Sequence, residues 1–125
     1  PTPPPTPHIR LTYNRNLLTL VNTVNTNANV SRLVLASPDG TQRLAVREWN
    51  AGFIRGSLNA LPQWNCVQAA LLDKNVSTPT ECRYSSLTLV LPTQALWRSD
   101  FVVLMNEVTV ATCIADDGVC EFDLP

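Results

Sequence analysis

The sequence is poor in several residues on which common functions depend. It contains one histidine, one lysine and four glycines in 125 residues, and charged residues make up only 15%. The formal net charge is -1, so there is no basic field for nucleic acid and no polybasic patch for an anionic membrane. No run of about 18 apolar residues occurs, as a membrane-spanning helix would need. We therefore expect neither nucleic-acid binding nor membrane insertion of this segment.

The shortage of histidine and glycine also weighs against an enzyme. Nucleophilic catalysis by serine or cysteine needs a base within hydrogen-bonding distance, most often histidine, and His8 stands beside a proline-rich segment. No G-x-S-x-G, H-E-x-x-H or phosphate-binding glycine loop occurs. Carboxylate pairs such as Asp39 with Glu48, or Asp116 with Asp117, could act as acid and base, but solvated turns are the simpler interpretation. We expect no catalytic residue and no cofactor.

Residues 1–7, PTPPPTP, differ in composition from the rest of the chain. Five prolines and two threonines favour extended polyproline II and offer nothing to a core. We interpret them as a linker, and residues 8–125 as one domain of a size that can bury one core. Because PTPPPTP cannot be a natural translation start, we expect an upstream segment such as another module or a membrane anchor.

From Ile9 onward, short apolar runs alternate with polar residues in the pattern of half-buried strands. Turn clusters such as NTNANVS, SPDG, TPT and DDG separate the runs. Residues 65–73 also fit helical spacing, and we interpret them as a strand. About seven or eight short strands at this spacing predict a β-sandwich or barrel. The other runs lie at 9–13, 17–21, 32–36, 42–46, 86–91, 101–105, 108–114 and 119–124.

Four cysteines, at positions 66, 82, 113 and 120, are the clearest chemical signal. They include no C-x2-C pair of the kind that zinc sites use, and a redox pair needs a helix N-terminus rather than an acidic turn. The stretch TCIADDGVC would form a hairpin that turns at DDG and places Cys113 opposite Cys120, with a bulge to correct their phase. Cys66 would then pair with Cys82. We predict two local disulfides; the alternative is four buried free thiols.

Disulfides would indicate an oxidising compartment, so we expect an extracellular or cell-surface protein. Sequons at Asn29 and Asn75, both reading NVS in turn-like segments, agree with export. Asp116, Asp117 and Asp123 could gather a calcium ion, but DDG is an ordinary hairpin signal. We expect no metal site.

A long loop at 48–63 is the segment most suited to binding, because loops on sandwiches carry many binding surfaces. Trp49 and Trp64 could present an aromatic platform to a sugar ring, and Arg47, Asn50 and Arg55 could supply directional hydrogen bonds. The simpler interpretation is that both tryptophans pack in or against the core, because a small sandwich needs large apolar side chains. A carbohydrate-binding module is therefore one function that the sequence allows.

The stretch LLTLVNTVNTNANVSRLVLASPDG resembles the opening of lamin-tail-type, immunoglobulin-like domains, with the match at residues 20–22 and 30–35. The segments at 47–52, 61–69 and 111–122 are similar to a small cysteine-bearing sandwich at the end of larger exported bacterial proteins. The resemblance implies an immunoglobulin-like antiparallel β-sandwich. Such domains are generally non-catalytic attachments, which implies a module for protein–protein contact or structural assembly at the cell surface.

Overall fold

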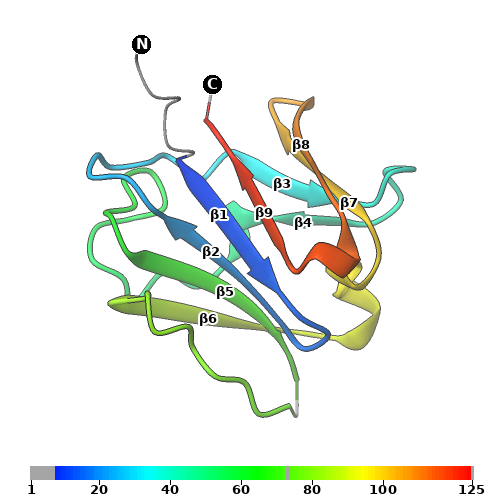
Figure 1. Cartoon of the computed structure of the whole chain (residues 1–125), viewed down its shortest axis with the longest axis horizontal. Helices are drawn as coiled ribbons and strands as arrows, with labels where there is room; N and C mark the ends of the chain where they lie inside the picture. Colours follow the sequence, from blue (N-terminus) through cyan, green and yellow to red (C-terminus); the bar gives the residue numbers. More distant parts are fainter. Residues whose placement is uncertain (1–7, 73, 125) are drawn as a thin grey trace.

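The chain forms two β-sheets that lie face to face, as a computed structural model of residues 8–72 and 74–124 shows (Figure 1). The interpreted linker, residues 1–7, lies outside the described residues, as do Asp73 and Pro125. In the described part of the chain every helical segment is a three-residue 3-10 turn. No described helix is long and apolar enough to span a membrane.

Nine strands make up the two sheets within the described residues, so the all-β prediction is confirmed. Residues 65–73, predicted as a strand despite their helical spacing, form β5 (Asn65–Leu71), and β6 (Tyr84–Val90) begins two residues earlier than predicted. The large sheet has the order β6-β5-β2-β1-β9 and the small sheet β4-β3-β7-β8. The strands are β1 (Ile9–Tyr13), β2 (Leu17–Asn22), β3 (Leu33–Ala36), β4 (Arg43–Ala45), β5 (Asn65–Leu71), β6 (Tyr84–Val90), β7 (Phe101–Met105), β8 (Val108–Cys113) and β9 (Val119–Phe122).

The core lies between the sheets and is built by the alternating apolar residues that predicted the strands. Leu11 and Leu20 of the large sheet face it, as do Leu35 and Phe101 of the small sheet, and each is fully buried. Removing such a side chain from water contributes about 1.5–3 kcal/mol. Trp97 closes one end of this core and donates its indole N–H to the carbonyl of Asn14 at 2.8 Å.

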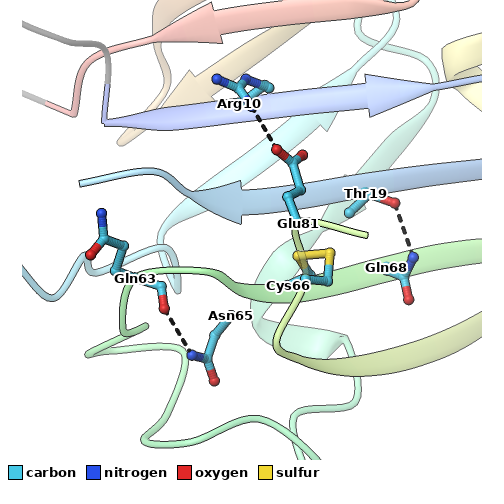
Figure 2. Close-up of a disulfide and its surroundings, with 8 residues drawn as sticks. Arg10, Thr19, Gln63, Asn65, Cys66, Gln68 and Glu81 are labelled. Atoms are coloured by element: carbon cyan, nitrogen blue, oxygen red, sulfur yellow. Dashed lines mark hydrogen bonds and ion pairs between the residues drawn. A yellow bond between two sulfur atoms is a disulfide. The ribbon is translucent and has the colours of Figure 1, made fainter. Parts of the chain in front are cut away.

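One strand pair departs from the antiparallel prediction, because β5 and β6 are parallel. Parallel neighbours need a crossover connection of about a dozen residues, and residues 72–83 provide it. This connection returns across the outer face of the large sheet, where Glu81 forms an ion pair with Arg10 of β1 at 2.6 Å beside the Cys66 disulfide (Figure 2). The large sheet is therefore mixed.

The outer face of β2 and β5 is also buried, which explains why both strands are buried at every position. Here Gln68 donates a hydrogen bond to Thr19 at 3.0 Å, which gives the polar pair a partner away from water (Figure 2).

The predicted hairpin around DDG is wrong, because β8 and β9 belong to different sheets. The chain changes direction at a 3-10 turn, Ala115–Asp117, and at the residue after it, Gly118, which has a φ of 67°. The Gly118 carbonyl accepts a hydrogen bond from the Tyr13 amide at 2.9 Å. This contact starts the pairing of β9 with β1. A register shift does occur, but it lies in the pairing of β7 with β8 and not in a hairpin that joins Cys113 to Cys120.

Candidate binding surfaces

Both predicted disulfides are present, with the predicted pairing. Cys66 and Cys82 have Cα atoms 5.6 Å apart, and those of Cys113 and Cys120 are 5.5 Å apart. The first ties β5 to the end of the crossover connection, and the second joins the small sheet to the large one. All four thiols are consumed, so the chain has no free cysteine nucleophile.

The five residues predicted to form one ligand site do not come together. Trp49 is buried, at 6% exposure, and belongs to the core. The core interpretation is thus confirmed for this ring and the platform alternative is wrong for it, because a small sandwich uses its large apolar side chains to fill the space between the sheets. Trp64 is half-buried and lies in a separate hollow.

Asn50 and Arg55 hold the long loop against β6. The Asn50 amide donates to the hydroxyl of Thr88 at 2.6 Å, and the Arg55 guanidinium lies 4.7 Å from the centre of the Tyr84 ring. The Arg55 amide also donates to the buried Asn65 side chain at 2.7 Å. These contacts give both residues a structural role in fixing the loop.

The hollow at Trp64 is small and polar at its rim. Trp64, Thr80, Glu81 and Arg83 line about 270 Å³. Trp64 has φ of 61°, a left-handed conformation that is rare for a bulky residue and costs on the order of 1–3 kcal/mol. Its amide donates to the Asn22 carbonyl and its carbonyl accepts from the Arg83 amide, both at 2.8 Å. The surrounding backbone thus holds the ring in this position.

Arg47 lies on the outer face of the small sheet, in a shallow groove of about 400 Å³ that we call the arginine groove. Its floor is apolar, and a neighbouring hollow of about 320 Å³ shares Val34, Arg47 and Glu107 with it. Sequence reasoning missed this surface because its residues come from separate segments. The groove is lined by Ser31, Arg32, Val34, Arg47, Leu104, Asn106 and Glu107.

An ion pair crosses this outer face from the β7–β8 turn to β4. The two terminal guanidinium nitrogens of Arg43 donate to the two carboxylate oxygens of Glu107, at 2.9 and 2.8 Å. Hydrogen bonding to Arg43 lowers the pKa of Glu107, and the same contact raises the pKa of Arg43. Asn106 and Glu107 both have positive φ, at 52° and 64°, in the tight turn that places this carboxylate.

β6 is an edge strand of the large sheet, and its sequence lacks the features that usually protect an edge. Tyr84–Val90 reads YSSLTLV, seven residues with no charge, proline or glycine. Four leucines on or next to this strand are exposed at 37–56%: Leu72, Leu87, Leu89 and Leu91. Together they form an apolar strip.

The other three edge strands are protected. β4 has only three residues and includes Arg43, and β9 has four and includes Glu121. β8 is also free of charge, proline and glycine, and its protection is the bulge in its register with β7. Short length, charge and bulges each discourage pairing with another chain. β6 is thus the edge in the described fold that is best suited to strand pairing.

Both predicted sequons lie at the surface. Asn29 is exposed, and its side-chain oxygen accepts hydrogen bonds from the amide of Ser31 at 3.1 Å and from its hydroxyl at 2.6 Å. Asn75 is exposed in the crossover connection. Glycosylation at these two positions stays a prediction.

Among residues 8–72 and 74–124, no group of three or more histidine, cysteine or acidic side chains could hold a metal ion. Asp123 accepts a hydrogen bond from the His8 amide at 3.1 Å, and the His8 ring lies 3.4 Å from the same carboxylate. The histidine thus contacts the carboxyl-terminal segment.

No protein-family model, curated protein or solved structure matches the chain. The lamin-tail-type resemblance therefore stays a proposal from the sequence, and the functional argument depends on the surfaces described above.

Proposed function

We propose that the chain is a non-catalytic, exported, immunoglobulin-like module that contacts neighbouring protein subunits at a cell surface. The observation that carries this proposal is the uncharged edge strand β6 with its exposed leucine strip. An unprotected edge presents unpaired backbone groups that a strand of another chain can satisfy. The leucines would add apolar burial to that pairing.

The loop next to β6 contacts this strand mainly through the side chains of the strand. Its amides at Asn50 and Phe53 donate to the side-chain hydroxyls of Thr88 and Ser86, rather than to the β6 backbone. The Asn50 side chain makes a 3.4 Å contact with the Leu87 carbonyl. The loop therefore supports β6 without adding a strand to it.

Export is supported by the two disulfides, because such bonds persist in oxidising compartments. The lamin-tail-type resemblance agrees with a domain attached to a larger surface protein. A linker at residues 1–7 would hold the module at a distance from that protein.

A charge placed on the β6 edge tests the proposal. Leu89→Lys is expected to abolish concentration-dependent association of the purified chain in sedimentation velocity, and Thr112→Lys on the edge strand β8 serves as the matched control. A photo-crosslinking residue at position 89 should also capture a neighbouring subunit on the native cell surface, and one at position 112 should not. Absence of both self-association and a crosslink specific to position 89 would contradict contact through β6.

A carbohydrate-binding module is the second candidate, and the hollow at Trp64 is the observation that favours it. An aromatic ring beside Glu81 and Arg83 has the stacking surface and hydrogen-bonding groups that sugars use. Binding of a soluble oligosaccharide should change tryptophan fluorescence in the wild type and not in Trp64→Phe, since Trp49 and Trp97 are buried. Unchanged fluorescence across a broad glycan panel would count against this candidate.

A further inference from the structure

The arginine groove is a second surface, on the opposite sheet from β6. Its lining includes Arg32 and Arg47, which are both exposed and form no ion pair with any described residue. Glu107 also lines the groove, but Arg43 binds its carboxylate through two hydrogen bonds. The groove therefore presents two unpaired guanidinium groups, although the whole chain has a net charge of -1.

Guanidinium groups fit carboxylates in particular, because their planar donors match the two carboxylate oxygens. The floor between the arginines is apolar, since Val34 and Leu104 are only half-buried and face the groove. A ligand that uses the whole groove thus needs negative charge at its ends and an apolar group in its middle.

The residues that line the groove also favour a peptide over an acidic glycan as its ligand. No aromatic residue lines the arginine groove or the adjoining hollow, so neither offers the ring that commonly stacks on a sugar. The apolar floor is suited to an aliphatic side chain.

We propose that the arginine groove binds an acidic peptide segment of a protein partner, with an aliphatic side chain on Val34 and Leu104 and carboxylates at Arg32 and Arg47. This surface lies on a different sheet from β6, so either proposal can fail alone. Glu107 limits the affinity, because it occupies Arg43 and adds negative charge to the groove.

Fluorescence anisotropy of a labelled peptide with alternating glutamate and valine tests the proposal on the full chain. Arg32→Gln and Arg47→Gln should each weaken binding about threefold, the effect of losing one exposed ion pair. Glu107→Gln should strengthen binding about threefold, because it frees Arg43 and removes a repelling charge. Raised salt should weaken binding to the wild type.

Arg15→Gln is the matched control, because Arg15 lines a different hollow and its replacement changes net charge equally. It should leave binding unchanged, and a glutamine–valine peptide should not bind the wild type. Equal losses from Arg15→Gln and Arg47→Gln would overturn the proposal, as would absence of peptide binding by the folded wild type. Tighter binding of a sulfated oligosaccharide of equal charge would overturn the choice of a peptide.

Discussion

Asp39 illustrates, at the scale of single residues, how one turn changes the chemistry of a side chain. Its carboxylate accepts hydrogen bonds from the Ser37 hydroxyl at 2.7 Å, the Thr41 hydroxyl at 2.8 Å and the Thr41 amide at 3.0 Å. These bonds, that of Ser37 first, lower the pKa of Asp39 from 3.8 to about 2. They favour the ionised form, because a charged carboxylate oxygen accepts hydrogen bonds more strongly than the oxygen of a neutral carboxyl group.

The resulting pH dependence can be measured. Asp39 stabilises the fold above its unfolded pKa of 3.8, and this contribution is lost as the pH falls through about 2. Ser37→Ala should raise the Asp39 pKa toward 3.8, which a carboxyl NMR titration would report. Ser31→Ala, on another turn, should leave it unchanged. An unshifted midpoint in Ser37→Ala would show that the Ser37 hydroxyl does not set this pKa.

Tyr13 supports a second prediction, because its hydroxyl connects β1 to the turn between β8 and β9. It donates to the Ile114 carbonyl at 2.6 Å, and its ring meets Phe101 edge-on at 5.3 Å. Tyr13→Phe keeps the ring contact and loses the hydrogen bond, so the free energy of unfolding should fall by about 1 kcal/mol. Urea denaturation would measure the change.

The control for Tyr13 is Tyr84→Phe, since Tyr84 is exposed and its hydroxyl has only a 3.4 Å contact with Arg55. Its effect should stay within about 0.5 kcal/mol. Burial has the largest effect on the pKa of Tyr13 and raises it, and the negative charges of Asp117 and Asp100 raise it further. Wild-type stability should therefore decline as the pH rises past the unfolded value of 10, and Tyr13→Phe should lack that part of the decline. Equal losses in both variants would contradict a specific role for the Tyr13 hydroxyl.

The sequence identified residue types suited to binding, but not their grouping. Arg47 is exposed, but its neighbours Arg32 and Leu104 lie far from it in sequence and meet it only through the pairing of β3 with both β4 and β7. The sequence leaves Trp49 open between a platform and the core, because a large aromatic residue in a loop has the same local pattern whether it points outward or into the core. Grouping depends on tertiary packing, which no local pattern encodes.

At the scale of elements, alternation and turn residues predicted where the strands are, because both are local properties. The sheet to which each strand belongs is not local. DDG reads as a hairpin, but Gly118 and the 3-10 turn before it carry the chain to the other sheet. Likewise, no local pattern in residues 72–83 indicates that this connection crosses the sheet, which makes β6 parallel to β5. Only the cysteine spacing indicated that its ends are close.

The crossover connection should depend on its disulfide. Removing Cys66–Cys82 as Cys66→Ala with Cys82→Ala should lower the free energy of unfolding by about 3 kcal/mol, the loop-closure value for about 15 residues. Because Cys82 lies two residues before the start of β6, backbone amides of residues 74–83 and of β6 should exchange faster with solvent. Hydrogen-exchange mass spectrometry would locate the change.

The matched comparison is Cys113→Ala with Cys120→Ala. Faster exchange there should concentrate in β8 and β9, which that disulfide joins. If both double variants showed faster hydrogen exchange in the same segments, the two disulfides would not act locally.

At the scale of the whole molecule, stability depends on one shared core and on two disulfides. A domain of this size has a net free energy of unfolding of about 5–15 kcal/mol. Two disulfides that close short loops contribute about 5–6 kcal/mol together on the chain-entropy estimate. The disulfides therefore account for about a third or more of the net stability, and at the lower end of that range the core alone would leave little margin.

Reduction of both disulfides should accordingly shift the guanidinium unfolding midpoint strongly downward and leave a measurable unfolded fraction without denaturant. The variant with all four cysteines replaced by alanine should reproduce that midpoint without reductant, which separates loss of the disulfides from other effects of the reagent. The folded chain would then accumulate only where thiols are oxidised, in agreement with an exported module. An unchanged midpoint after complete reduction would show that the core suffices, and the disulfides would no longer support export.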